Sequence, residues 1–215
     1  MMIKKFLHSC ILLEENGKKL LIDPGWFCFI ENKIKPEDIG PVDVILLTHR
    51  HPDHYYPEAL KWFVSKRKIK IICNEEISDL LKKENIESEI IKSSEIKTAE
   101  GFSIKAFDAP HGCLPIEVPH NVAFLINNKV LHPGDSFEVE VPGVQVLLLP
   151  IAGPWATLSA AMEFANRLRP ETVIPIHDAI IKDFMLERMY TMCKSFLEKN
   201  KIDFKPLGIG HSLDI

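Results

Sequence analysis

The chain lacks the segments that carry a protein into or across a membrane. None of its 215 residues belongs to an apolar run near the roughly 18 residues that a membrane-spanning helix requires. A short apolar stretch follows Lys4 and Lys5, but His8 interrupts it and Glu14 and Glu15 end it, which is unlike a secretory signal peptide. We therefore expect a soluble protein of the cytoplasm that does not associate with membranes.

Excess positive charge and a paired set of cysteines are also missing. The formal net charge is -4 and the isoelectric point is near 6.1, so we expect no nucleic-acid partner. Five cysteines, an odd number without a C-x-x-C pair, indicate reduced thiols rather than a disulfide framework. We expect a small-molecule substrate as the partner, and a homo-oligomer because homodimers are common.

The composition is that of one folded domain with a mixed α/β fold. Hydrophobic residues make up 46% of the chain and no long linker interrupts it, which predicts a single domain over residues 1–215. Early predicted strands are separated by turns and later ones by helices, which suits two packed sheets with helices outside. The predicted strands are Ile3–Leu7, Ile11–Glu14, Lys19–Asp23, Val44–Thr48, Ile69–Cys73, Ser88–Lys92, Phe102–Phe107, Val122–Ile126, Lys129–His132, Val144–Leu148 and Thr172–Ile176; the predicted helices are Pro57–Ser65, Glu75–Glu84, Leu158–Leu168 and Ile181–Lys199.

Four metal-ligand side chains stand within six residues directly after an apolar stretch. The stretch ends at Leu47 as a predicted buried strand, and His49, His51, Asp53 and His54 follow it. Residues two apart lie on the same side of an extended chain, so the first two imidazoles can meet one ion. The proline at position 52 favours a turn that carries the last two side chains toward a second position. The spacing therefore indicates a metal site with room for two ions.

This H-x-H-x-D-H segment resembles the signature of the metallo-β-lactamase superfamily of hydrolases. The family pattern also requires a later His, a later Asp and a final His, each on a loop after a strand. His111, Asp135 and His177 stand in such places, so the resemblance runs from about Leu7 to His177. It implies a four-layer αββα sandwich that holds one or two metal ions.

The resemblance also implies a ligand set. Imidazole nitrogen and carboxylate oxygen suit zinc, which is our first expectation for two divalent ions, although manganese and iron accept the same donors. By the family's roles, one ion is held by His49, His51 and His111, the other by Asp53, His54 and His177, and Asp135 bridges them.

The expected reaction is hydrolysis by a metal-bound hydroxide of a small ester, lactone or phosphodiester. Metal-bound water has a pKa of roughly 7, so hydroxide is available at neutral pH. The carboxylate of Asp53 is the expected catalytic group that orients the water or accepts its proton. The alternative is a metal-binding protein of the same fold without robust catalysis, a sensor or regulatory module, because a complete ligand set is not sufficient for turnover.

Position 51 and the chain length argue against two other superfamily activities. Members that reduce oxygen or nitric oxide on two irons resemble this pattern with Glu in place of His51, and they carry an added flavin domain. The best-known nuclease branches carry an extra domain for which this chain has no room.

Within the superfamily the chain resembles a small cytoplasmic branch that includes ascorbate-6-phosphate lactonase-like proteins. The segments that carry this likeness are Leu149–Thr157, Ile174–His177, His8-Ser9 and Ile22–Pro24. The branch usually has Gly where this chain has Leu7, and a Gly-Gly pair where it has Ala152-Gly153. The substrate of that branch is therefore not transferred to this chain.

Several positions leave two interpretations open. His120 competes with His111 as a ligand, because it also lies in a proline-rich loop before a strand. His8 is either a donor behind the ligands, or at the rim of the site, or an ordinary strand-end residue. Asp23 either supports the ligand loop or forms an Asp-Pro turn. Four aromatic residues either line an apolar pocket wall or belong to the core: Trp26, Phe27, Phe29 and Trp155.

Overall fold

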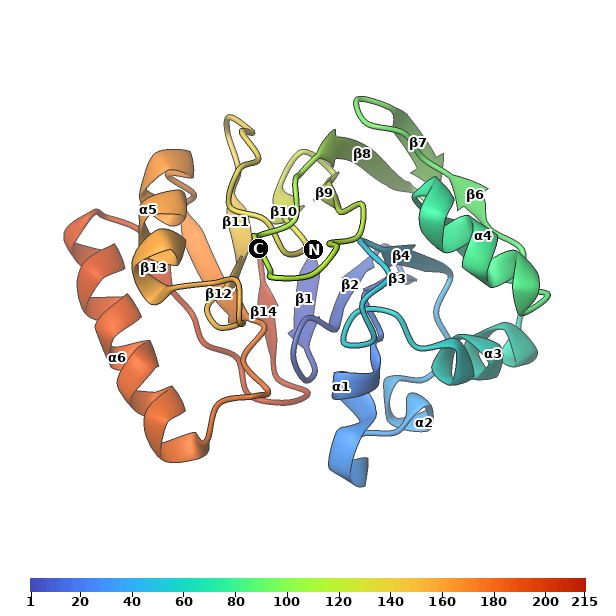
Figure 1. The fold of residues 1–215 in the computed structure, drawn as a ribbon, viewed down its shortest axis with the longest axis horizontal. Coiled ribbons are helices and arrows are strands. Elements are labelled where there is room, and N and C mark those ends of the chain that lie inside the picture. Colours follow the sequence, from blue (N-terminus) through green and yellow to red (C-terminus); the bar gives the residue numbers. More distant parts are fainter.

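Two seven-stranded sheets lie face to face in the computed structural model, which describes residues 1–215 (Figure 1). The first sheet has the strand order β14-β1-β2-β3-β4-β5-β6 and the second β13-β12-β11-β10-β9-β8-β7. The strands of the first sheet are β1 (Met2–Lys5), β2 (Ile11–Glu15), β3 (Lys18–Ile22), β4 (Val44–Leu47), β5 (Lys70–Cys73), β6 (Glu89–Ile90) and β14 (Ser212–Asp214). Those of the second are β7 (Ile96–Ala99), β8 (Phe102–Asp108), β9 (Val122–Ile126), β10 (Val130–His132), β11 (Val146–Pro150), β12 (Thr172–Ile176) and β13 (Asp203–Phe204).

Both sheets begin as antiparallel meanders and continue as parallel strands. In the first sheet β1, β2 and β3 pair antiparallel, and β3, β4, β5 and β6 pair parallel. In the second sheet the antiparallel pairs run from β7 to β10 and the parallel pairs from β10 to β13. Antiparallel neighbours need only a tight turn, whereas parallel neighbours need a long crossover. Turns therefore connect most of the antiparallel strands of each sheet, and helices lie in most connections between its parallel strands.

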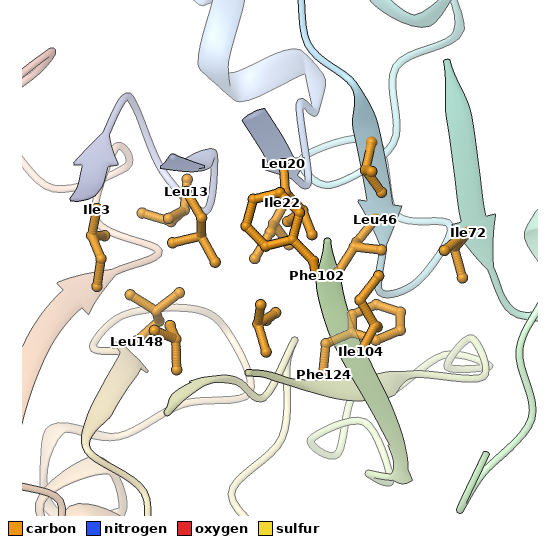
Figure 2. Close-up of a cluster of buried hydrophobic side chains, with 14 of the residues drawn as sticks. Ile3, Leu13, Leu20, Ile22, Leu46, Ile72, Phe102, Ile104, Phe124 and Leu148 are labelled. Carbon is orange, nitrogen blue, oxygen red and sulfur yellow. The ribbon is translucent and has the colours of Figure 1, made fainter. Parts of the chain in front are cut away.

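The space between the sheets is filled by alternate side chains of the strands. Strand β4 is buried along its whole length because both of its faces are covered. Val44 and Leu46 point into the cluster between the sheets, and Ile45 and Leu47 point to the outer face. Figure 2 shows Leu46 of the first sheet in this inner cluster together with Phe124 of the second. The inter-sheet core therefore fixes the register that delivers the residues after β4.

Helices cover the outer face of each sheet, so the predicted αββα sandwich is confirmed (Figure 1). The first sheet packs against α3 (Pro57–Lys66) and α4 (Glu75–Lys83), the second against α5 (Leu158–Leu168) and α6 (Asp183–Lys199). The amide oxygen of Asn74 accepts from the backbone N–H of Ile77 and caps α4, and Thr157 caps α5 in the same way. All four helices were predicted from the sequence to within two residues.

The short elements were not predicted. They are α1 (Trp26–Phe29), the 3-10 helix η1 (Ile30–Asn32), α2 (Pro36–Ile39), β7, β13 and β14. The three helical elements among them have four residues or fewer, little more than one turn, so they show no helical period in the sequence. Strand β14 forms only because the end of the chain pairs with β1, and the terminal residues Met1 and Ile215 exchange hydrogen bonds.

Two expectations about composition can be compared with the structure. All five cysteines are unpaired, as predicted. No helix is both long enough and apolar enough to span a membrane.

Candidate metal centre

The candidate ligands stand on loops that each follow a strand. His49, His51, Asp53 and His54 follow β4, and His177 is the first residue after β12. The other three loops belong to different parts of the chain: His8 follows β1, His111 follows β8 and Asp135 follows β10. The strands end at the same place in the sandwich, and their loops form two groups of side chains whose potential ligand atoms lie within 4.8 Å of one another.

The first group contains His49, His51, His111 and Asp135. Nδ1 of His51 lies 3.2 Å from Nε2 of His111. The same Nε2 lies 3.5 Å from Oδ2 of Asp135, and Nε2 of His49 lies 3.8 Å from that oxygen. Three imidazole nitrogens and one carboxylate oxygen therefore converge on one point.

The second group contains His8, Asp53, His54 and His177. Its centre is Oδ2 of Asp53, which lies 3.1 Å from Nε2 of His8 and 3.3 Å from Nε2 of His177. Nε2 of His54 lies 3.8 Å from the same oxygen. This group differs from the predicted one by including His8 itself.

Asp135 lies between the two groups. Its Oδ1 is 3.0 Å from Nε2 of His54, and its Oδ2 is 3.2 Å from Nε2 of His177. The carboxylate thus contacts ligand candidates of the second group as well as those of the first. Its position is the one that a carboxylate bridging two ions would need.

The donor set fits two divalent cations. Buried polar atoms without a partner cost about 1–3 kcal/mol each, so they are rare in folded proteins. Here Nε2 of His49, His54 and His177 and Oδ1 of Asp135 are all buried without a hydrogen bond. Zinc held at about 2.0–2.1 Å by a tetrahedron of ligands places adjacent ligand atoms about 3.3 Å apart. The separations of 3.1–3.8 Å given above within the two groups are close to that value.

Asp23 and Thr48 hold two of the imidazoles in the orientation that a metal needs. Nδ1 of His54 donates to Oδ2 of Asp23 at 2.7 Å, and Nδ1 of His49 donates to the Thr48 hydroxyl at 3.0 Å. That hydroxyl in turn donates to Asp23 at 2.7 Å, and the Thr48 N–H donates to the other Asp23 oxygen. With both Nδ1 atoms protonated, both Nε2 lone pairs face the centre. The supporting interpretation of Asp23 is thus the one that its contacts favour.

Close backbone packing fixes the loop that carries Asp53. A Cβ added to Gly25 would lie 2.0 Å from the carbonyl oxygen of Asp53, so only glycine fits at this position. The N–H of Trp26 donates to the carbonyl of Pro52 at 2.7 Å. The loop after β3 therefore supports the loop after β4.

The charges of the site suit cation binding. Burial opposes ionisation of Asp135, but the neighbouring imidazoles of His177 and His54 hold the pKa of this carboxyl well below its usual range. Burial and the neighbouring His177 lower the pKa of His8 to about 4, so this imidazole is neutral at pH 7. Burial lowers the pKa of His177, but the Asp135 and Asp53 carboxylates raise it to about 9, so a cation that binds here would displace a proton from this imidazole. Ionised carboxylates in a buried site attract cations.

The structure shows which of the remaining histidines can bind a metal. His111 is buried in the first group, and its Nδ1 donates to the carbonyl of Gly112 at 2.7 Å. His120 is exposed, with its Nε2 3.8 Å from Asp108, and it belongs to neither group. His132 is buried, but both of its ring nitrogens already contact the backbone, at Ser9 and Gly134. Of the three, only His111 is placed to bind metal.

Two residues behind the ligands were not identified from the sequence. The indole Nε1 of Trp155 donates to Oδ2 of Asp135 at 2.8 Å, whereas the sequence offered only a pocket wall or the core for this side chain. Asn121 accepts from the N–H of Asp135 and donates to the carbonyls of Ala109 and Pro133. Asn121 therefore joins the loop of His111 to the loop of Asp135. The only feature of the sequence that could have indicated this role is the place of Asn121, a polar residue directly before the apolar strand β9.

The site reaches solvent at one side. The side chain of Asp53 is 17% exposed and His51 is partly exposed, whereas the other side chains of the two groups are buried. Solvent therefore reaches the two groups at Asp53 and His51.

Comparisons with known proteins identify the family of the chain. The Beta-lactamase superfamily domain matches residues 2–177. The UPF0173 metal-dependent hydrolase Ta0764 of Thermoplasma acidophilum is 32% identical over 184 residues, which cover 79% of this chain and 80% of that protein. Protein Rv0786c of Mycobacterium tuberculosis is 29% identical over 188 residues, which cover 84% of this chain and 85% of that one.

A solved structure shows the same fold. The metallo hydrolase Igni18 of Ignicoccus hospitalis has a TM-score of 0.75 and 23% identity, covering 99% of this chain and 98% of that chain. The likeness to ascorbate-6-phosphate lactonase-like proteins is not tested by these matches and stays a prediction. From the matched domain and the relatives, the chain belongs to the metallo-β-lactamase superfamily and is a metal-dependent hydrolase.

Proposed function

We propose that the protein hydrolyses a small ester, lactone or phosphodiester with two divalent metal ions, zinc in the first place. The observation that supports this best is the set of buried, unpartnered ligand atoms arranged around one shared carboxylate, Asp135. His49, His51 and His111 would hold one ion, Asp53, His54 and His177 the other, and Asp135 both.

When bound, such ions lower the pKa of a coordinated water toward 7 and polarise the oxygen of the electrophile. In this proposal Asp53 is the residue that accepts the proton of the attacking water. Its Oδ2 lies at the centre of the second group, and its side chain is the partly exposed carboxylate of the site. From there it orients the attacking water and accepts its proton.

The first experiment is elemental analysis of protein purified without chelator, for wild type and for His51→Ala and His177→Ala. We expect about two metals per chain in wild type and a loss in each variant. Little or no metal, even after addition of zinc, manganese or iron, would contradict the dinuclear site.

The second experiment is a hydrolysis screen of lactones, esters, thioesters and phosphodiesters with metal-loaded protein. We expect Asp53→Asn to lose most of the activity. Asp108→Asn makes the same chemical change on an exposed side chain outside both groups, so it serves as the matched control. Unchanged activity in Asp53→Asn would overturn the role of Asp53, and metal binding without turnover of any substrate would favour a sensor or regulatory module.

A further inference from the structure

A cleft of about 710 Å³ lies beside the second ligand group. Clefts of roughly 300–1,000 Å³ with mostly apolar walls are the usual sites for small molecules. One wall comes from the segments after β1 and β3, and the other from the segment between β12 and α6. The apolar lining residues are Leu7, Phe27, Ile30, Ala179, Ile180, Ile181 and Phe184.

One lining residue of this cleft contacts the second ligand group. The ring of Phe27 packs edge-on against the imidazole of His8, with the ring centroids 5.1 Å apart. Leu7 directly precedes His8, and Ala179 follows His177 by two residues. The segment that carries Phe27 therefore borders the cleft and contacts the second ligand group, and it also supports the loop of Asp53 through Gly25 and Trp26.

Exposed apolar side chains gather at the mouth of the cleft. Two of the nine exposed large hydrophobic residues line it, Ile180 at 51% and Phe184 at 75% exposure, and two more, Trp26 at 44% and Met185 at 39%, are chain neighbours of the lining residues Phe27 and Phe184. Grouped apolar side chains on a surface cost solvation and commonly mark a ligand-binding groove. Their position beside the metal centre points to a substrate with an apolar part.

The charges of the cleft do not select a charged ligand. Glu31 and Lys33 form an ion pair with 2.9 Å between Oε2 and Nζ, and the remaining charged lining residues are one cation, Lys182, and one anion, Asp183. Arg50, which stands between His49 and His51 in the chain, pairs with Glu76. A substrate with several negative charges therefore finds no surplus of free cations here.

The cleft continues into a second hollow of about 370 Å³. The two share the lining residues Leu7, Lys33, Ala179, Ile181 and Asp183, so they lie side by side along the segment after His177 and together form the groove. The far end adds further apolar side chains, which are Leu186, Leu207 and Ile209. An extended alkyl chain thus has room beyond the first cleft.

We propose that the substrate is an uncharged carboxylic ester with a medium-length alkyl chain on its acyl side, and that this chain lies in the groove while the ester carbonyl meets the metal centre. This inference rests on the proposed hydrolase function. In the reaction, the water oxygen forms a bond to the acyl carbon, the bond from that carbon to the alcohol oxygen breaks, and the alcohol leaves with one proton. The products are a carboxylate, an alcohol and one released proton.

The test is a series of p-nitrophenyl esters from butanoate through hexanoate and octanoate to decanoate, assayed with metal-loaded protein. Burial of each methylene in the groove should raise kcat/KM about twofold to fourfold. Phe184→Ser should flatten this dependence. Phe196→Ser changes the same residue type on the same helix, outside the groove, and should leave the dependence unchanged. Equal rates along the series, or equal effects of both variants, would overturn the inference.

Calorimetric binding of the sodium salts of the same four acids separates this inference from the hydrolase proposal. The carboxylate is constant along the series, so differences in Kd report the chain alone. Affinity that rises with chain length and falls in Phe184→Ser, without turnover of any ester of the series or of any substrate in the hydrolysis screen, would support the groove and contradict the hydrolase function. Ester turnover together with chain-independent affinity would overturn the groove and leave the hydrolase function intact.

Discussion

The Nε2 atom of His8 lies 3.1 Å from Oδ2 of Asp53, and His8 is fully buried. Its other nitrogen, Nδ1, has no partner. His54 and His49 use the opposite ring nitrogen for their hydrogen bonds. Each donates from Nδ1, and its Nε2 faces the centre of the site. A buried N–H without a partner costs more than a buried lone pair, so the contact fits an Nε2–H of His8 that donates to Asp53. We infer that His8 is a positioning residue that acts through Asp53.

Replacement of His8 by alanine should weaken the second ion about 10-fold to 100-fold, because outer hydrogen bonds orient the ligating carboxylate. His8→Gln keeps a donor and should restore most of the affinity. The measurement is metal content together with competition titration, and His211→Ala, on an exposed histidine, is the control. Equal losses in His8→Ala and His8→Gln would instead assign His8 as a ligand.

Trp155→Phe should weaken metal binding by about tenfold, since it removes the indole donor to Asp135 while keeping an aromatic ring. The unfolding free energy of the metal-free protein should fall by about 1 kcal/mol for the lost hydrogen bond. Metal titration and urea unfolding measure the two effects. Trp62→Phe on α3 is the matched control, and an equal change in both variants would show that the indole N–H of Trp155 is not important.

Gly25→Ala should disturb the ligand loop, because the new Cβ would lie 2.0 Å from the Asp53 carbonyl oxygen. Forced overpacking of this kind costs about 1–3 kcal/mol. Gly208→Ala meets only the exposed side chain of His211, at 3.2 Å, and should be nearly neutral. Urea unfolding and metal content of both variants test this, and wild-type metal content in Gly25→Ala would show that the loop can move without loss of the site.

Asp43→Asn should make stability less dependent on pH. Burial opposes ionisation of Asp43, but the N–H of Lys19 and the Lys18 and Arg67 side chains hold its pKa below the usual 3.8. A pKa lower in the folded than in the unfolded chain stabilises the fold above about pH 4, and this stability is lost as the pH falls through the folded value.

We therefore expect Asp43→Asn to lose about 1–3 kcal/mol of unfolding free energy at pH 7 and less at pH 3. Urea unfolding of chelator-treated protein at both values measures the difference, and Asp203→Asn, whose carboxylate is 67% exposed, is the control. A deficit of the same size at both pH values would contradict the ionic role of Asp43.

Much of the fold follows from local patterns. Strand β9 and helix α5 have the predicted bounds, because buried strands and amphipathic helices show their apolar faces in the sequence itself. The turn at Asn16-Gly17 between β2 and β3 is also local, since both residues take positive φ and this pair is favoured in tight hairpins. These features depend on neighbours a few residues apart.

The sequence alone also determined which loop carries the ligands, because H-x-H-x-D-H after a buried strand leaves few other uses for those side chains. It could not place His8 or Trp155, whose partners Asp53 and Asp135 lie 45 and 20 residues away. It favoured His111 over His120 only through the family pattern, and it is the folded chain that buries His111 in the first group and leaves His120 exposed. The groove beside the site was likewise hidden, because its walls come from segments about 150 residues apart. Hydrogen bonds and clefts between distant segments depend on how the sheets pack, and no local period in the sequence records that packing.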